Sequence, residues 1–383
     1  MNTADIEAKL AGQDDIVRLD PQVIGRFYGD ANRLGQRSPK ARTPAYYKPE
    51  RWIGSSTLAT NPPGIPSGGV STCKALRDGG RKLTLKQLVA HPQFGPRLLG
   101  EDRYRQHDGS FRVLIKLLDA QYPIPFHVHA DDAFVWANPN VYPKEQCGKD
   151  EAYHFLDVDK GTCPYTHLGV YPGVGPKQVV AAMRRGTDHV IELSRGALQR
   201  FGEGFIVKAG LLHRPGSALT LEIQQPSDVY TFFQTDFGGQ PLPEEALYPG
   251  FDSIEEAAER VINWQDNLQE DLLEATRLTP TSVEPAIAGG RAEWIYPPQV
   301  SDKFSGMRLT VEQTMRLRAE DPFLLFVWKG AGTLNGHAIE GGGGRPTTDD
   351  EAFIGRQAAQ RGIEIANTGD QPLVVFALFA AKV

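Results

Sequence analysis

The chain has 383 residues, 23% charged and 40% hydrophobic, which is ordinary for a folded globular protein and gives room for two or three domains. A formal net charge of −6 argues against nucleic acid or an anionic membrane surface as a partner, and no segment approaches the roughly 20 apolar residues of a membrane-spanning helix. The first residues lack the basic and apolar regions of a secretory signal, so we expect a cytoplasmic protein.

The three cysteines, Cys73, Cys147 and Cys163, are too few and too irregularly spaced for a disulfide framework or a zinc ribbon. Glycine is the informative excess, because 40 glycines and 28 prolines are scattered between short apolar runs. This distribution favours many short strands joined by turns, as in a β-barrel or jelly roll. One pooled run, Gly341 to Gly344, is interpreted as a flexible surface loop.

The first third of the chain contains one predicted helix and one strong strand signal. Residues 1–50 are polar and irregular and carry no motif, so we expect them to wrap the first domain or to be partly mobile. Residues 83–89 have helical spacing, with Thr84 as a candidate N-cap. The apolar run 111–119 predicts a strand buried on both faces. Lys116 interrupts it, and the pattern leaves open whether this lysine has an internal partner or reaches water from an edge.

The middle of the chain alternates strands with helical segments. Residues 148–157 are a strand candidate, and alternation places Lys149 and Glu151 on the same face. Residues around 177–198 fit helical spacing and predict a helical insertion. Ser253 is a candidate cap for a second helical stretch that runs to Leu273. Further strands are expected over 204–216 and 218–225.

Short strands recur from Trp294 onward, on the far side of the second helical stretch. They are expected over 308–311, 323–328, 332–335 and 373–379. Because strand-forming material occurs twice, the sequence predicts two β-barrels in one chain. We place the parts at 1–50, an irregular segment; 51–250, the first barrel; 251–293, a helical linker; and 294–383, the second barrel.

Residues 123–132, Pro-Ile-Pro-Phe-His-Val-His-Ala-Asp-Asp, contain the main candidate for chemistry. His127 and His129 are two apart in an extended context, so both imidazoles point to one face of a strand. Such a pair is more often a core or loop feature, and a divalent metal needs three or four ligands at about 2.0 to 2.5 Å. Glu151 and His213, which ends a strand, would complete a set of three imidazoles and one carboxylate. Coordination positions would then remain open for substrate or water.

The flanking segments carry a family resemblance. Five stretches occur in order with matching spacing: Phe-Arg-Val-Leu-Ile-Lys-Leu-Leu-Asp-Ala120, His-Val-His-Ala-Asp-Asp132, Gly-Lys-Asp-Glu151, Ala-Gly-Leu-Leu-His213 and Leu-Glu-Ile-Gln-Gln-Pro-Ser-Asp228. From about Trp52 to Asp236 the chain resembles the type I phosphomannose isomerases of the cupin superfamily. The resemblance implies a mainly β fold with helical insertions and two cupin-like jelly-roll barrels, a bicupin, whose second barrel lacks metal ligands.

The resemblance also implies a chemistry, the interconversion of mannose 6-phosphate and fructose 6-phosphate through an enediol. It implies one divalent metal ion, zinc in most members, held by His127, His129, Glu151 and His213. Lys149 and Glu222 match groups near the reacting carbons, and Lys116 matches a lysine at the phosphate end of the pocket. Glu222, or Lys149 with a lowered pKa, would serve as the base; alternatively, Lys149 merely pairs with a neighbouring carboxylate.

Three departures from the family pattern bear on the substrate. His127 stands where the family usually has glutamine, which strengthens nitrogen ligation and would admit iron, nickel or manganese beside zinc. Phe232, ten residues after Glu222, replaces an arginine that faces the reacting oxygens. Pro125 replaces a serine that contacts phosphate in some members. These losses suggest a less negatively charged substrate, such as an unphosphorylated sugar, or a lost activity.

The sequence therefore predicts a metal-dependent sugar or sugar-phosphate aldose–ketose isomerase resembling mannose-6-phosphate isomerase. The expected partner is a small carbohydrate, and the sequence says nothing of the oligomeric state. One alternative is an iron-dependent cupin oxygenase, since three histidines and a glutamate also suit O₂ chemistry. Another is a non-catalytic, metal-containing sugar-binding cupin whose activity lapsed with the change to Phe232.

Overall fold

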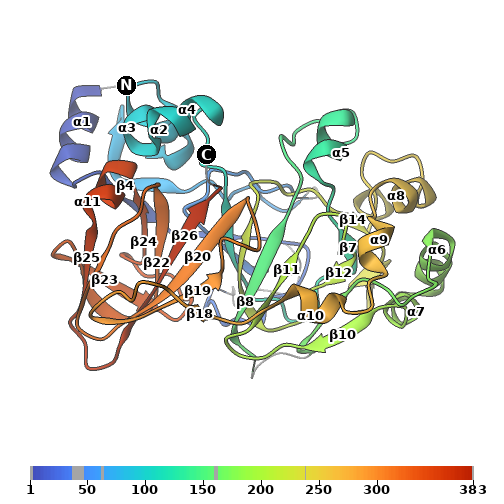
Figure 1. Cartoon of the computed structure of the whole chain (residues 1–383). Helices are drawn as coiled ribbons and strands as arrows, with labels where there is room; N and C mark the ends of the chain where they lie inside the picture. Colours follow the sequence, from blue (N-terminus) through green and yellow to red (C-terminus); the bar gives the residue numbers. More distant parts are fainter. Residues whose placement is uncertain (1–2, 37–46, 62–63, 159–162, 238, 382–383) are drawn as a thin grey trace.

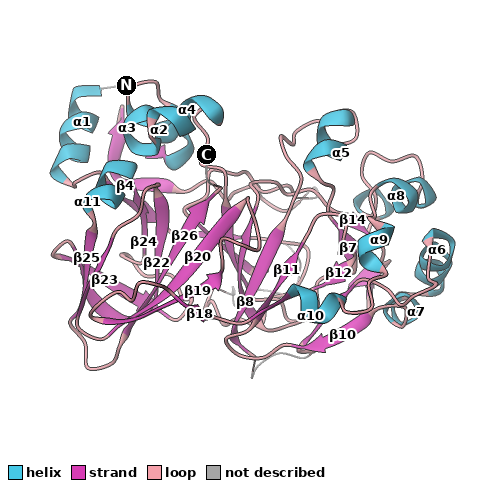
Figure 2. Cartoon of the chain, in the orientation of Figure 1, coloured by secondary structure: helices cyan, strands magenta, loops and turns pink. Residues whose placement is uncertain are grey.

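The computed structural model describes residues 3–36, 47–61, 64–158, 163–237 and 239–381. The chain is mainly β, with antiparallel sheets and short helices at their ends and flanks (Figures 1 and 2). This confirms the predicted mainly-β class with helical insertions. None of the helices in these ranges is long and apolar enough to cross a membrane.

A seven-stranded sheet forms one wall of the region that holds the candidate site. Its strands lie in the order β17 (Arg277–Leu278), β11 (Gly204–Val207), β8 (Glu151–Asp157), β13 (Leu219–Gln224), β6 (Leu114–Leu118), β3 (Glu50–Ile53) and β2 (Gln22–Ile24). Every residue of β6 is buried, as the apolar run predicts. Lys116 is therefore an internal residue and does not lie on an edge strand.

A five-stranded sheet supplies the opposite wall. Its order is β10 (Arg195–Leu198), β9 (Tyr165–Leu168), β12 (His213–Arg214), β7 (His127–Val128) and β14 (Thr231–Phe232). In Figure 1 helices surround this sheet on the right of the molecule. They are α5 (Asp132–Ala137), α6 (Pro176–Arg185), α7 (Thr187–Ile191), α8 (Ile254–Arg260), α9 (Trp264–Asn267) and α10 (Leu272–Thr276). A short pair, β15 (Asp236–Phe237) with β16 (Gln240–Pro241), and the 3-10 turn η2 (Glu244–Ala246) follow β14.

The C-terminal strands form a twelve-stranded sheet on the left of Figure 1. Its main path is β18 (Thr281–Ser282), β19 (Gly290–Tyr296), β20 (Phe304–Val311), β26 (Leu373–Ala380), β22 (Phe323–Leu334), β24 (Glu351–Ile354), β1 (Ile16–Asp20), β4 (Thr72–Asp78) and β5 (Arg81–Thr84). Off this path lie β21 (Thr314–Leu317), β23 (His337–Gly342) and β25 (Ile363–Asn367). Helices α1 (Thr3–Gly12), α2 (Leu85–Ala90), α3 (Phe94–Leu99), α4 (Glu101–Gln106) and α11 (Arg356–Arg361) cover its upper end.

Buried contacts join the C-terminal sheet to the seven-stranded sheet. The Tyr296 hydroxyl donates a 2.6 Å hydrogen bond to the carbonyl oxygen of Leu221. His154, on the face of β8 opposite Glu151, lies between the rings of Tyr296 and Phe376. One hydrophobic cluster includes residues of both sheets, so the two parts share a core.

The two predicted helix N-caps are confirmed. The Thr84 hydroxyl caps α2 and forms a reciprocal capping box with Gln87. The Ser253 hydroxyl caps α8, although the helical stretch predicted to reach Leu273 is divided into three short helices. The expected insertion at 177–198 is helical only to Ile191, because Arg195 to Leu198 pair with β9 as a strand whose residues are alternately buried and exposed.

Three other expectations are corrected. Residues 323–328 and 332–335 belong almost entirely to one long strand, β22, because Gly330 and Gly332 let it pass close to neighbouring backbone. Gly341 and Gly342 are paired residues of β23, and only Gly343 and Gly344 form the expected turn. Residues 1–50 do not simply wrap the first domain, because β1 pairs with β24 of the C-terminal sheet while β2 pairs with β3.

Candidate active site

Neighbouring strands bring the three candidate histidines together. His213 of β12 lies opposite His127 of β7, and their ring centroids are 4.0 Å apart. His129, two residues along, presents its ring to the same space, as alternation predicts. A ligand nitrogen from each of the three lies within 4.8 Å of the others, and all three side chains are buried.

The backbone fixes which nitrogen of each ring faces the shared space. Each Nδ1 atom lies 2.6 to 2.8 Å from a backbone carbonyl oxygen, which can only accept a hydrogen bond. Each Nδ1 therefore carries a proton that it donates, and Nε2 of each ring is turned toward the shared space. The accepting carbonyls belong to Pro125, Val229 and Leu211. Metal-binding histidines are commonly oriented by such bonds.

Glu151 adds a carboxylate to this group. Its oxygens lie 3.4 Å from Nε2 of His129 and 3.1 Å from Nε2 of His213, which is buried without a hydrogen-bond partner. An imidazole lone pair and a carboxylate oxygen are both acceptors. The Lys149 ammonium contacts both groups at His129, but Nε2 of His213 has no donor, so its buried contact with Glu151 is unfavourable without a further cation. The donor set of nitrogen and oxygen atoms therefore fits a divalent ion such as zinc.

The protonation states agree with this assignment. Burial, together with the nearby Lys149 ammonium, lowers the pKa of His129 to about 3. Burial and the two neighbouring imidazoles hold the pKa of His127 well below its usual value. Although burial alone would raise the pKa of Glu151, the charge of Lys149 and contacts with His129 hold it well below the usual range. These groups are ready to bind a cation without losing a proton at neutral pH.

Lys149 stands beside the histidines as a buried cation. Its Nζ lies 2.8 Å from a Glu151 oxygen, 3.1 Å from Nε2 of His129 and 3.4 Å from a Glu222 oxygen. Burial lowers the pKa of Lys149, but the two carboxylates outweigh burial and raise it above its usual value. The structure thus pairs Lys149 with Glu151, and the raised pKa argues against Lys149 as the base.

Glu222 is the titratable carboxyl group at the centre of the seven-stranded sheet. It lies opposite Lys116 on β6 and Tyr153 on β8, and 2% of its surface is exposed. Burial raises the pKa of Glu222 to about 8, because Lys116 and Lys149 offset only part of the desolvation. Near neutral pH this carboxyl group can both accept and donate a proton.

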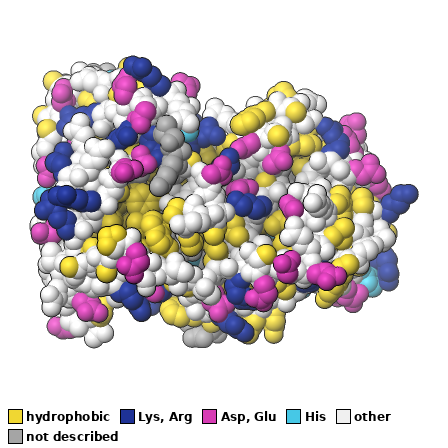
Figure 3. All heavy atoms as spheres, viewed as in Figure 1, with side chains coloured by type: hydrophobic (Ala, Val, Ile, Leu, Met, Phe, Trp, Pro, Cys, Tyr) yellow, Lys and Arg dark blue, Asp and Glu magenta, His cyan; other side chains and the backbone are white. Residues whose placement is uncertain are grey.

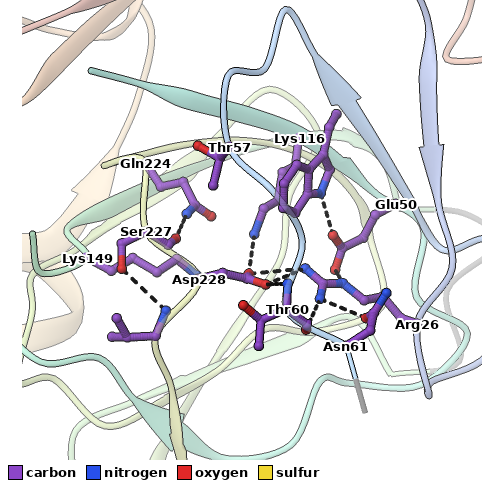
Figure 4. A network of polar contacts seen from close by, with 12 residues as sticks. Arg26, Glu50, Thr57, Thr60, Asn61, Lys116, Lys149, Gln224, Ser227 and Asp228 are labelled. Carbon is purple, nitrogen blue, oxygen red and sulfur yellow. Dashed lines mark hydrogen bonds and ion pairs between the residues drawn. The ribbon is translucent and has the colours of Figure 1, made fainter. Parts of the chain in front are cut away.

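A polar wall that sequence reasoning missed lies beside Lys116 (Figure 4). Arg26 donates from Nε to Glu50 at 2.9 Å and from Nη2 to both oxygens of Asp228 at 3.1 Å. The Lys116 ammonium lies 3.6 Å from Asp228. Although burial would raise the pKa of Glu50 and of Asp228, Arg26 and Lys116 outweigh it and hold both pKa values below normal. Both carboxylates are therefore ionised at neutral pH.

Little in the sequence indicates this wall. Arg26 and Glu50 fall in the segment 1–50, where no motif is recognisable, and sheet pairing brings them to the site. A basic residue directly after the apolar Val-Ile-Gly and before Phe-Tyr was the available signal. Asp228 closes a segment already noted for the family resemblance, but the sequence did not indicate its partner.

An aromatic wall faces the histidines. The Phe232 ring lies 5.7 Å from that of His127, stacks on Tyr230 at 4.5 Å and meets Phe27 edge to face at 6.1 Å. These walls line a cavity whose empty space, open solvent included, is about 530 Å³. The residues predicted for the site all line this cavity, except His213, which is fully buried against His127.

The other histidines add no second group of possible metal ligands in the parts of the chain that the structure describes. Acidic and basic side chains are interspersed over the face shown in Figure 3. Among the described residues, the three histidines above form the one group of three or more possible metal ligands that lie close together. His337, in the C-terminal sheet, is exposed.

Comparison with known proteins identifies the fold. No protein-family model matches the sequence, and no curated protein matches it. The structure is similar to mannose 6-phosphate isomerase from Bacillus subtilis (TM-score 0.67, 18% identity, 95% of this chain and 99% of that chain). It is also similar to a variant of phosphomannose isomerase from Salmonella typhimurium (0.66, 13%, 96% and 100%) and to a zinc-bound mannose 6-phosphate isomerase (0.63, 14%, 96% and 100%). The chain therefore has the fold of the phosphomannose isomerases over nearly its whole length, as the resemblance predicts.

Proposed function

We propose that the protein is a metal-dependent aldose–ketose isomerase that acts on a small carbohydrate. The observation that carries the proposal is the convergence of three buried imidazoles and one carboxylate beside a cavity that also contains Glu222 and Lys149. The structural neighbours support the same class, since they are mannose 6-phosphate isomerases and one of them is zinc-bound.

The four predicted ligands, His127, His129, Glu151 and His213, would hold a single divalent ion. Zinc is the first candidate, and the nitrogen-rich set would also accept manganese, iron or nickel. When bound, the ion supplies a Lewis acid that polarises the carbonyl and hydroxyl oxygens of the sugar. The Nδ1 hydrogen bonds to the backbone orient the imidazoles for this role.

The protein's own residues would move the proton. Ionised Glu222 accepts the proton from one of two adjacent carbons while the carbonyl oxygen gains a proton, which gives the enediol. The same carboxyl group then protonates the other carbon while the other hydroxyl group loses its proton and becomes the carbonyl. Its pKa of about 8 suits both steps near neutral pH. Lys149, held protonated by Glu151 and Glu222, donates hydrogen bonds to the oxygen on which negative charge develops. Lys116 and Phe232 contact the substrate from opposite sides.

We also propose the finer architecture expected from the sequence, two cupin-like barrels at 51–250 and 294–383 joined by the helical segment 251–293. Strands β20 to β26 lie together in one sheet, which supports the second barrel, while β4 and β5 of the first part join that sheet through β1. The second barrel would be structural, because its histidine, His337, is alone and exposed. A cytoplasmic location is consistent with the three cysteines, which are all unpaired thiols.

Metal analysis combined with solvent-deuterium incorporation tests the proposal. The metal-loaded protein is incubated in D₂O with a panel of aldoses and ketoses, with and without 6-phosphate groups. We expect one bound divalent ion per chain and deuterium at the carbon next to the carbonyl. Oxygen consumption with bound iron would instead identify an oxygenase, and saturable sugar binding without exchange would identify a binding protein.

A further inference from the structure

We infer that the cavity takes an unphosphorylated sugar, whose distal hydroxyl groups bind the wall formed by Arg26, Glu50, Lys116 and Asp228. This inference rests on the proposed function and assigns its substrate class. It is carried by the pairing of every basic side chain of the cavity with a carboxylate.

The cavity wall contains three basic side chains and four acidic ones. Each basic group is already paired: Arg26 with Glu50 and Asp228, Lys116 with Asp228, and Lys149 with Glu151 and Glu222. At the polar wall two cations face two ionised carboxylates, so this wall has no net positive charge. A phosphate site normally offers unpaired guanidinium or ammonium donors.

A phosphate group at this wall would lie against two carboxylates in a poorly solvated place. Asp228 is 9% exposed and Glu50 is 3% exposed, so water screens their charges weakly. Binding a dianion there would require Arg26 or Lys116 to leave its partner, and an uncompensated buried carboxylate is strongly unfavourable. Phosphate binding is therefore opposed both by repulsion and by the loss of existing ion pairs.

Neutral hydroxyl groups match the same wall well. A hydroxyl donates one hydrogen bond and accepts others, so it can donate to Asp228 while it accepts from Lys116 or Arg26. Carboxylates that are ionised and oriented by neighbouring cations need no rearrangement to accept a hydrogen bond from such a hydroxyl group. Asp228 is held in place by Arg26 and by the backbone N–H of Thr60, which donates to it at 3.0 Å.

The aromatic wall points to the same substrate class. Phe232, Tyr230 and Phe27 present rings beside the histidines, where a charged sugar derivative would need donors. Apolar rings suit the C–H faces of a sugar ring, which lose water favourably against an aromatic surface. One side of the cavity would thus contact carbon-bound hydrogens, and the other would contact hydroxyl groups.

The first experiment compares phosphorylated and unphosphorylated substrates on the zinc-loaded full chain. Binding and deuterium exchange are measured for D-mannose, D-fructose and their 6-phosphates. We expect kcat/KM and affinity for the neutral sugars to exceed those for the phosphates at least tenfold. Exchange that favours the phosphates would overturn this inference and leave the isomerase proposal intact, whereas no exchange with any of the four would overturn both.

A second experiment alters the charge of the wall. Asp228→Asn keeps the shape of the side chain but frees the charges of Arg26 and Lys116, so binding should shift at least tenfold toward mannose 6-phosphate relative to mannose. Asp119→Asn is the matched control, because Asp119 forms a comparably buried pair with Arg33 at 2.6 Å outside the cavity wall. In this control the ratio of the affinity for mannose 6-phosphate to that for mannose should stay at the wild-type value. An unchanged ratio in folded, metal-loaded Asp228→Asn would overturn the inference.

Discussion

The C-terminal sheet and the sheets around the cavity bury different kinds of side chain. From residue 294 to 381 the buried acidic and basic side chains are Asp350 and Glu351, both paired with Arg51, and the rest of the core is largely aliphatic and aromatic. The cavity region instead buries a continuous series of cations, carboxylates and imidazoles. Burying such groups costs free energy unless each is paired, so this region is organised for binding and the C-terminal sheet for stability.

A large-to-small change in the C-terminal core should have the greatest effect on stability. Phe323 is fully buried and packs on Phe379 with ring centroids 5.0 Å apart. We expect Phe323→Ala to lower the free energy of unfolding by about 3 to 5 kcal/mol, through lost burial and a residual cavity. Urea titration measures this loss. Zinc affinity of the folded variant should remain near wild type; a large fall would mean that the two regions are not separable.

Removing one imidazole should instead weaken metal binding, in contrast to the loss of stability expected for Phe323→Ala. We expect His129→Ala to weaken zinc binding at least about 100-fold, or roughly 2.7 kcal/mol, because one of four ligands is lost. Metal content is measured after dialysis against buffered free zinc. His337→Ala, which alters an exposed histidine of the C-terminal sheet, is the control and should keep its metal. Stoichiometric zinc in His129→Ala would contradict the assigned ligands.

The junction between the two regions should make the protein sensitive to acid. Burial, with Arg308 nearby, lowers the pKa of His154 to about 3. In the unfolded chain this histidine has a pKa near 6.5, so on acidification the unfolded chain binds the proton before the folded chain does. Stability that is present above pH 6.5 is therefore lost as the pH falls toward 3. Between pH 6.5 and 5 the loss from this group is about 2 kcal/mol. Parallel urea titrations of wild type and His154→Leu should show a shallower pH slope in the variant; equal slopes would exclude His154 as the cause.

The smallest predicted effect concerns the aromatic wall. Phe232→Arg restores a fork-shaped cation beside His127, so it should raise kcat/KM for a 6-phosphorylated sugar about tenfold, or roughly 1.4 kcal/mol. Phe232→Met is the neutral control and should not produce this gain. Steady-state kinetics with both sugar classes make the measurement. An unchanged value for Phe232→Arg would mean that the cavity has diverged from the geometry of its structural neighbours.

Local patterns predicted what depends on local structure. Alternation placed His127 and His129 on one face, and the caps at Thr84 and Ser253 were readable because a capping hydroxyl bonds within its own turn. The polar wall was not predictable in the same way, since Arg26 reaches Asp228 across 202 residues of sequence. The raised pKa of Lys149 was not predictable either, because it depends in part on Glu222, which only the pairing of β13 with β8 brings near.

The pairing of β1 with β24 has a consequence for how the protein matures. During synthesis the segment that contains Arg26 emerges early, but the strand just before it pairs with residues 352–354, near the other end of the chain. This pairing can therefore form only after residues 352–354 have left the ribosome, and until then β1 has β4 as its strand partner.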